Sequence, residues 1–369
     1  MKIAIITEAF FPNIGGMEVS FLELGRSLVK MGHEVEVYTL RLNERDRAED
    51  SIDGLKIHRI TKAFHYFKSI WGLRNYPDVI RFTIDLVRLG RGLNRFDFIV
   101  FNLWPVVPAI ILPRFIQPKM AVYWCEVYDK PFWRFIYQLI IRFGPKFHCG
   151  VNQNICDFLH NRYQVPESHL KTLISGVYAS LYQCDRTAKC DRSILFFGRL
   201  APHKDPEAVI KAFLSRQLAQ KGYELNIVGG GPLYEKLRHQ YQHERGIKIH
   251  GAVEEDRKIE FLQRASLLVL PSQREGFPRV CAEAAAAGTP ILTTLYPANG
   301  TVNVVTQYGI GWLSNPNLAE LAEKIERYGS MKTEEWEFVA ARCQKMAHTR
   351  FDWEIVAQEF LAIARTETA

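Results

Sequence analysis

The chain has 369 residues, of which 47% are hydrophobic and 24% are charged, and its formal net charge is +7. This balance excludes long disordered stretches, and the length predicts two domains that each bury a core. No apolar run approaches the roughly 18 residues that cross a bilayer, and the run Ile3–Ile6 is too short for a signal peptide. We therefore expect a cytoplasmic protein that either stays in solution or lies peripherally on the inner face of a membrane.

Strands and helices alternate from the start of the chain. The apolar spacing predicts a strand over Lys2–Thr7, a helix over Met17–Met31 and a second strand over Val35–Leu40. A strand–helix–strand unit of this kind pairs its two strands in parallel. Later strands of the first half are predicted at Phe98–Phe101, Met120–Trp124 and Cys149–Val151.

A polar stretch without strands, Gln183–Arg192, is the predicted linker, and a second alternating series follows it. Its strands are predicted at Ser193–Phe197, Glu224–Val228, Lys248–His250, Leu267–Leu270 and Pro290–Thr293. Its helices are predicted at Pro206–Leu218, Leu233–Arg245, Arg257–Ala265 and Arg279–Ala287, and the tail is helical. Two consecutive doubly wound α/β domains follow from this order. Such domains bind ligands at the carboxyl ends of their strands, which here means a cleft between them.

Three loops after strands carry glycine. The first contains Gly15 and Gly16 at the start of a helix, where backbone N–H groups can face an anion, although a plain tight turn explains it equally well. The second contains Gly198. The third runs from Gly229 to Pro232, but the dinucleotide pattern G-x-G-x-x-G fails there because Tyr234 occupies the third glycine position. A nicotinamide oxidoreductase is therefore disfavoured, while close approach by a base or ribose remains open.

Two basic residues, Arg199 and Lys204, follow Gly198 just before a helix that Asp205 and Pro206 begin. The planar guanidinium and the mobile ammonium group suit a diphosphate, and a solvated pair of basic residues is the alternative.

Two carboxylates bracket the most informative loop. Glu275 lies in the loop after a strand, and Glu283 lies about a turn and a half inside the helix that Pro278 begins. The N–H groups at this helix start form an anion site between the carboxylates, and they belong to Phe277, Arg279 and Val280. A sugar or ribose hydroxyl pair would satisfy a glutamate in so apolar a segment. A helix-dipole contact for Glu275 and a salt bridge for Glu283 are the alternative.

Several chemical signatures are absent from the sequence. It has no G-x-x-x-x-G-K-[ST] loop, no H-E-x-x-H and no Asp-x-Asp pair, so we expect no metal. Arg199, Lys204 and helix N-termini would then neutralise any diphosphate. The seven cysteines form no C-x-x-C pair and are odd in number, which indicates reduced thiols.

Together these loops resemble the retaining, GT-B-fold glycosyltransferases of family 4, from Lys2 to about Arg365. The matching residues are Phe11-Pro12, Gly15-Gly16 with Glu18, Gly32 to Val35, Gly198-Arg199-Leu200 with Lys204, Val228-Gly229 with Gly231-Pro232, and Glu275 with Glu283 in E-x7-E spacing. The resemblance implies two Rossmann-like domains that face a central cleft. Residues 1–185 would bind the acceptor, residues 190–350 the nucleotide-sugar, and residues 351–369 would form a helix that crosses back to the N-terminal domain.

The resemblance also implies an activity. A sugar would pass, with retention, from a nucleotide diphosphate to a hydroxyl of a glycan or lipid-linked acceptor, without a cofactor. A UDP-sugar is favoured over GDP-mannose. Glu275 would contact the donor sugar at its reacting centre, and Arg199 and Lys204 would stabilise the leaving diphosphate. The nucleotide-sugar would be held by Gly15, Gly16, Gly198, Arg199, Lys204, Gly229, Gly231, Phe277, Arg279, Val280 and, through the ribose hydroxyls, Glu283.

Two departures from the family pattern keep other hypotheses open. Many relatives carry a histidine after the strand Ala121–Trp124, where this chain has Glu126 and Asp129. These two residues and Glu18 are candidates for the acceptor or donor-sugar side. Asn303 stands where relatives have an acidic residue. A catalytically silent homologue that serves as a partner subunit is therefore the second hypothesis, and a nicotinamide oxidoreductase is a distant third.

The positive charge points to the acceptor side. Residues 1–190 hold 25 Lys and Arg against 18 Asp and Glu, whereas residues 191–369 hold 22 of each. A solvated basic surface or an anionic partner explains the excess. We expect no nucleic-acid partner, since the aromatic segment Phe64–Lys68 with Trp71 fits a loop at a membrane at least as well. Pro131–Phe143 is apolar around most of its circumference, which predicts a buried helix. The hypothesis that remains is docking of the N-terminal domain on an anionic membrane.

Overall fold

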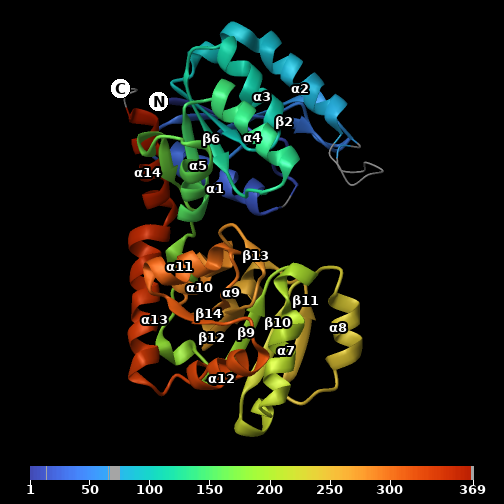
Figure 1. Ribbon diagram of the computed structural model, residues 1–369, viewed down its shortest axis with the longest axis vertical. Coiled ribbons are helices and arrows are strands. Elements are labelled where there is room, and N and C mark those ends of the chain that lie inside the picture. Colours follow the sequence, from blue (N-terminus) through green and yellow to red (C-terminus); the bar gives the residue numbers. More distant parts are fainter. Residues whose placement is uncertain (14, 65, 67–74, 367–369) are drawn as a thin grey trace. The chain divides into compact units, whose positions relative to one another are not determined.

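The computed structural model describes residues 1–13, 15–64, 66 and 75–366, and the chain divides into two compact units (Figure 1). Unit 1 comprises Met1–Ile174 and Trp353–Ala369, and unit 2 comprises Ser175–Asp352. Each unit is built on its own largely parallel β-sheet with helices packed against it. Each unit therefore has a Rossmann-like α/β architecture, as the resemblance implied.

Unit 1 contains an eight-stranded sheet in the order β3-β4-β2-β1-β5-β6-β7-β8. All neighbouring strands pair in parallel except β3 and β4, which form an antiparallel edge. The strands are β1 (Lys2–Ile6), β2 (Glu34–Arg41), β3 (Glu49–Ile52), β4 (Leu55–Lys62), β5 (Phe98–Asn102), β6 (Lys119–Trp124), β7 (Phe147–Gly150) and β8 (Leu170–Thr172). Every residue of β5 is buried, as expected of a central strand covered on both faces.

The helices of unit 1 include one from the end of the chain. They are α1 (Gly16–Lys30), α2 (Tyr76–Leu89), α3 (Val106–Ile111), α4 (Pro131–Phe143), α5 (Gln153–Tyr163) and α14 (Trp353–Arg365). The last of these, α14, packs on α1. Its Phe360 ring meets the Phe98 ring of β5 edge to face, with 5.5 Å between the ring centres. The C-terminal helix therefore belongs to the N-terminal domain, as the family resemblance implied.

One expectation for unit 1 is wrong. Helix α4 has the predicted bounds, but it is not buried: only Tyr137 and Ile140 are, whereas Phe132, Phe135 and Phe143 are 55%, 59% and 37% exposed. The apolar residues of α4 itself are distributed around most of its circumference. Only one side of the helix packs inward, so the apolar residues on the opposite side stay in water.

Unit 2 contains a six-stranded parallel sheet in the order β11-β10-β9-β12-β14-β16. These strands are β9 (Ser193–Phe197), β10 (Glu224–Val228), β11 (Ile247–Gly251), β12 (Leu267–Leu270), β14 (Ile291–Thr294) and β16 (Gly311–Ser314), while β13 (Arg274–Glu275) and β15 (Ala298–Asn299) pair separately. The helices are α6 (Ala179–Tyr182), α7 (Pro206–Ser215), α8 (Tyr234–Tyr241), α9 (Glu255–Arg264), α10 (Arg279–Ala286), α11 (Gly300–Tyr308), α12 (Leu318–Tyr328) and α13 (Glu334–Met346).

The boundary between the units precedes the linker predicted at Gln183–Arg192. The short helix α6 lies before that stretch and packs on α9 and α10, so it is part of unit 2. Among the described residues, no helix is both long and apolar enough to cross a membrane.

Candidate functional site

Three loops meet at the carboxyl edge of the unit 2 sheet. They follow β9, β10 and β12, and β9 lies between the other two strands in the sheet. The amide of Leu200 donates to the carbonyl of Gly230 at 2.9 Å, which joins the first loop to the second. The amide of Gln273 donates to the carbonyl of His203 at 2.8 Å, which joins the first loop to the third. This edge is where a doubly wound sheet binds its ligand.

Glycine is required where the first two loops touch. Gly229 has φ +143°, and a Cβ there would lie 1.8 Å from the carbonyl oxygen of Gly198. Gly231 has φ +147°, and its Cβ would lie 2.6 Å from the carbonyl oxygen of Leu200. Backbone contacts this close, at angles that other residues rarely adopt, explain both glycines without a dinucleotide motif.

The predicted residues Lys204 and Glu275 form an ion pair. The Lys204 ammonium contacts Glu275 Oε1, and the Ser272 hydroxyl donates to the same oxygen at 2.9 Å. The Glu275 side chain is only 9% exposed. Its backbone is held by the pairing of β13 with β15. A lysine that precedes α7 and a glutamate that precedes α10 are thus brought together, as one binding site requires.

Positive charge gathers around this pair. The pKa of His203 is lowered, first by partial burial and then by the charges of Lys204, Arg274 and Arg199. Two members of this group, Arg199 and Lys204, were predicted as diphosphate ligands. Arg274 was missed, although its place directly before Glu275 in the sequence could have indicated it.

Glu283 is buried on α10 between two cations. Lys258 Nζ lies 3.0 Å and an Arg279 guanidinium nitrogen 3.5 Å from the same carboxylate oxygen, Oε1. Lys258 also pairs with Glu255 at 2.7 Å, and the Tyr182 hydroxyl donates to Glu255 at 2.7 Å. The salt bridge considered for Glu283 is therefore present. Its main partner, Lys258, was not identified from the sequence, because it comes from α9.

The start of α10 presents backbone and side-chain donors. Pro278 is the residue that caps the helix, and Arg279 begins it. Arg279 Nε is buried, and within the described parts of the chain it has no hydrogen-bond partner. Phe277 is buried, and the centre of its ring lies 6.0 Å from the centre of the Phe351 ring.

Burial raises the pKa of the Cys281 thiol well above its usual range, and the nearby Glu275 adds to the shift. A neutral Cys281 leaves the two glutamates as the anionic groups here.

The candidates of unit 1 lie at the carboxyl ends of β1 and β6. Gly15 caps α1, and a Cβ on it would meet Glu18 Oε2 at 2.3 Å, so this carboxylate lies at the helix start, where the dipole favours it. A Cβ on Gly16 would meet no atom within 4 Å. After β6, the Tyr128 hydroxyl donates to Glu126.

The same β6–α4 loop holds a second carboxylate, Asp129. It pairs with Arg134 at 2.6 Å, and this hydrogen bond lowers the pKa of Asp129. The loop is joined to the helix by a further contact, in which the amide of Tyr128 donates to the Tyr137 hydroxyl at 3.2 Å.

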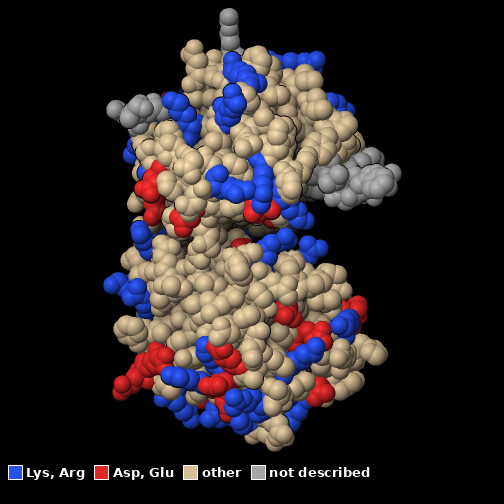
Figure 2. All heavy atoms as spheres, in the orientation of Figure 1, with Lys and Arg blue, Asp and Glu red and all other residues tan. Residues whose placement is uncertain are grey.

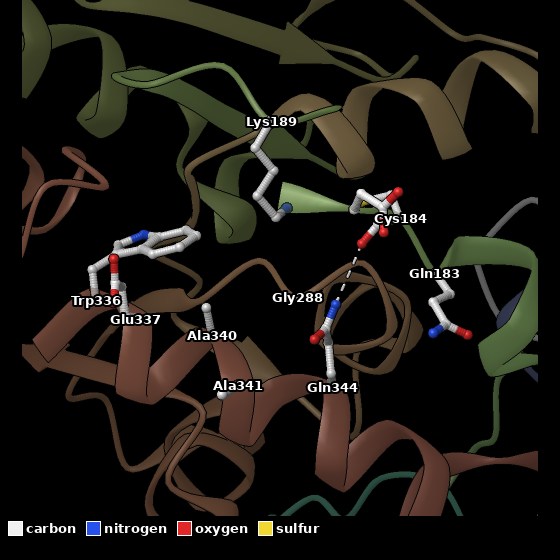
Figure 3. Close-up of a pocket in the computed structure, with 10 residues that line it drawn as sticks. Gln183, Cys184, Lys189, Gly288, Trp336, Glu337, Ala340, Ala341 and Gln344 are labelled. Atoms are coloured by element: carbon white, nitrogen blue, oxygen red, sulfur yellow. Dashed lines mark hydrogen bonds between the residues drawn. The ribbon is translucent and has the colours of Figure 1, made fainter. Parts of the chain in front are cut away.

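A groove of about 320 Å³ lies at the other edge of the unit 2 sheet (Figure 3). Lys189 precedes β9 and Gly288 precedes β14, so the groove adjoins the amino ends of the strands. Lys189 Nζ donates to the Thr289 hydroxyl at 2.7 Å and to two carbonyls at the end of α9, and burial lowers the pKa of this amine to about 8. Gln344 reaches Cys184 across the groove. These contacts join the chain segment before β9 to the end of α9, to Thr289 and to α13, away from the three loops.

Within the described ranges, no group of three or more His, Cys, Asp or Glu residues is arranged to hold a metal ion. The groups at the three loops and at the start of α10 are cations, amides and two carboxylates, each of which is paired with a lysine. This set matches an anionic, hydroxyl-bearing ligand.

Comparison with known proteins assigns both halves of the chain. The family described as Glycosyl transferases group 1 matches residues 186–341, and Glycosyltransferase Family 4 matches residues 14–179. A GDP-mannose:cellobiosyl-diphosphopolyprenol alpha-mannosyltransferase of Komagataeibacter xylinus is 25% identical over 98% of this chain and 92% of its own.

Two solved structures have the same fold. Sucrose-phosphate synthase of Thermosynechococcus elongatus has a TM-score of 0.77 and 17% identity, with 99% of this chain and 98% of that chain covered. HepE of Anabaena, crystallised with UDP and glucose, has a TM-score of 0.72 and 16% identity, with 98% of each chain covered.

Proposed function

Because the chain belongs to the family 4 glycosyltransferases with the GT-B fold and is an enzyme that uses a nucleotide-sugar donor, we propose that it transfers a hexose to a hydroxyl of a glycan or lipid-linked acceptor. In this proposal the transfer retains the anomeric configuration and needs no metal ion. Retention, the acceptor class and metal independence are the parts of this proposal that experiment has to test.

The pairing of Lys204 with Glu275 carries the proposal. In the absence of a ligand, each of these groups neutralises the other at the carboxyl edge of the sheet. A nucleotide diphosphate would attract Lys204, with Arg199 and Arg274, to its phosphates, and Glu275 would then turn to the sugar hydroxyls. Once the donor is bound and these charges are in place, they stabilise the leaving group without reorganisation of solvent.

The leaving diphosphate has a second set of donors at the start of α10. The N–H groups of Arg279 and Val280 and the unpaired Arg279 Nε would bind phosphate oxygens there. Glu283, buried among Lys258 and Arg279, would accept hydrogen bonds from the ribose hydroxyls. These groups would fix the donor in one orientation, and alignment of this kind lowers the barrier for an incoming hydroxyl.

The donor base would lie against the β10 loop, whose Gly229 and Gly231 expose backbone. A UDP-sugar is our first choice, in line with the UDP bound to HepE. GDP-mannose is the second, since it is the donor named for the Komagataeibacter relative. Glu126, Asp129 and Glu18 would face the acceptor or the donor sugar, and Gly16 would let the first loop close over the diphosphate.

A donor panel tests the proposal. The protein is incubated with UDP-glucose, UDP-galactose, UDP-N-acetylglucosamine and GDP-mannose, and the release of nucleoside diphosphate is measured with and without EDTA. Proton NMR of the first-formed product gives its anomeric configuration. We expect one donor to turn over, with retention and at the same rate in EDTA. Tight binding without turnover of any donor, an inverted product, or a rate that EDTA abolishes and Mg²⁺ restores would each contradict a part of the proposal.

A further inference from the structure

Helices α2, α3 and α4 lie side by side on unit 1, with the short turn Leu112–Arg114 after α3, and we call these elements with Phe115 the outer helical layer. Most of the large apolar side chains that are exposed in the described part of the chain lie on this layer. They are Tyr76, Ile80, Ile84 and Leu89 of α2, Phe115, and Phe132, Phe135 and Phe143 of α4. Exposed apolar groups that gather in this way mark an interaction surface, whereas single ones do not.

The exposed phenylalanines of α4 form a stripe. Phe132, Phe135, the half-buried Leu139 and Phe143 follow one another at intervals of three and four residues, so they line one side of the helix over its whole length. The opposite side holds Tyr137 and Ile140, which pack inward. On α2, Tyr76, Ile80 and Ile84 repeat the interval of four. Two helices of the layer, which both pack on α3, thus turn apolar rows to the solvent.

The layer is also basic. The layer contains five arginines against two acidic residues, Asp78 and Asp85, and α4 itself contains no acidic residue. Figure 2 shows Lys and Arg side chains on the face of unit 1 where Figure 1 draws α3 and α4. Arg114 and Arg142 lie over the Phe143 ring, at 4.8 and 5.4 Å from its centre. Cations directly beside exposed aromatic rings are the composition of a helix that rests in a membrane interface.

We propose that the outer helical layer docks on an anionic phospholipid bilayer. The phenylalanines of α4 and the apolar residues of α2 enter the interface, and Arg114 and Arg142 bind lipid phosphates at its rim. The positive excess of the layer selects this partner, because an anionic leaflet attracts each nearby Lys or Arg.

Docking through α4 also places the acceptor loop at the bilayer, a consequence that rests on the function proposed above. The Asp129–Arg134 ion pair and the hydrogen bond from the amide of Tyr128 to Tyr137 join the β6–α4 loop to the docked helix. Glu126 lies in the same loop. A saccharide on a membrane lipid would therefore meet Glu126 and Asp129 at the surface, without leaving the bilayer.

Co-sedimentation with vesicles tests the docking independently of any transferase activity. The full chain is mixed with vesicles of phosphatidylcholine alone or of phosphatidylcholine with phosphatidylglycerol, at low and at high salt. We expect binding only to the anionic vesicles, and weaker binding at high salt. The variant R114Q/R142Q should lower the partition coefficient about fivefold per arginine. The variant F132S/F135S should lower it about tenfold per phenylalanine.

Matched variants in unit 2 provide the controls. Phe338→Ser removes a phenylalanine that is 69% exposed on α13, and R238Q/R245Q removes two exposed arginines. Neither should change vesicle binding. Equal recovery of the wild type with both kinds of vesicle, or loss of binding in the control variants alone, would overturn the proposal. A concentration-dependent dimer that F132S/F135S abolishes, without vesicle binding, would also overturn it and would assign the layer to a second copy of the chain.

Discussion

Helices α4 and α10 both follow a loop at the carboxyl end of a strand, and both are rich in apolar residues, yet they meet opposite environments. In α10, every residue from Val280 to Ala286 is buried. In α4, only Tyr137 and Ile140 are. The difference lies in side-chain size. The alanines of α10 let α6, α9 and α13 approach it from several sides, whereas the aromatic rings of α4 keep neighbours away from all but one face.

Helix packing thereby separates two tasks. A slim, enclosed helix holds its backbone and Glu283 in fixed positions, which suits recognition of a nucleotide-sugar. A wide helix with an unpartnered apolar side suits an interaction surface. A helix that only faced solvent would not need apolar residues on that side. Each prediction below tests one side of this contrast.

The largest effect is expected from Lys204→Ala, in the loop that faces the start of α10. The substitution removes the cation that we assign to the leaving diphosphate and leaves Glu275 without its ion-pair partner. Loss of one preorganised electrostatic group costs about 10²–10³-fold in kcat. Steady-state rates with the identified donor measure this loss.

Lys211→Ala is the matched control, since Lys211 is an exposed lysine on α7 that pairs with Glu207. Its rate should equal that of the wild type. A Lys204→Ala enzyme with unchanged kcat would remove Lys204 from the reaction.

The second effect concerns stability. Glu283→Gln keeps the shape of the side chain but removes the charge between Lys258 and Arg279. Removal of one partner from a buried ion pair costs about 3–5 kcal/mol, and we expect the lower end because Glu255 remains beside Lys258. Urea unfolding measures the change. Glu260→Gln, at an exposed pair on α9, is the control, and an equal effect of the two substitutions would contradict the buried role of Glu283.

The contrast between α4 and α10 also limits what could be predicted from the sequence. The central strands of both sheets and the glycine loops were predictable, because strand, turn and helix signals agree locally there. Strand β4, which lies between β3 and β2, was missed because its alternation is interrupted by Arg59. This arginine is buried through contacts with Asp50 and with the backbone of Arg47 and Phe11.

At the site, too, residues that belong to a local sequence pattern could be predicted, and contacts between separate elements could not. The ion pair of Lys204 with Glu275 joins two landmarks of one sequence pattern, so both residues could be selected in advance. Lys258 could not be, since it reaches Glu283 from a helix whose own sequence indicates only local i,i+3 and i,i+4 charge pairs. Apolar composition predicted α4 as a helix with correct bounds. Its exposure depends on how many neighbours pack around it, which local periodicity does not contain.

A third test overpacks α10. Ala284→Leu inserts a large side chain where the alanine is completely buried, and overpacking of this kind costs about 1–3 kcal/mol. Ala341→Leu places the same side chain on an exposed position of α13 and should leave the free energy of unfolding nearly unchanged. Equal urea midpoints for Ala284→Leu and the wild type would mean that α10 is not tightly enclosed.

A smaller, pH-dependent effect is expected at His203. Burial and the charges of Lys204, Arg274 and Arg199 lower its pKa in the free protein. A bound diphosphate would offset those charges and raise the pKa, so binding takes up protons and affinity increases as pH falls. Calorimetry with the intact nucleotide-sugar should give several-fold tighter binding at pH 5.5 than at pH 7.5. The His203→Gln variant should bind equally at both values, and an unchanged pH dependence in that variant would exclude His203 as the proton acceptor.

The smallest effect, and the sharpest contrast with α10, is expected from F132S/F135S on α4. Both rings are more than half exposed, so their removal takes little apolar surface out of the folded core. Substitutions at exposed positions change the free energy of unfolding by about 0.5 kcal/mol or less. Urea unfolding and the rate with a soluble acceptor should both match the wild type, while vesicle binding falls. A loss of stability comparable to that of Ala284→Leu would instead mean that the phenylalanines of α4 support the fold of unit 1, and the two helices would then differ in exposure without differing in task.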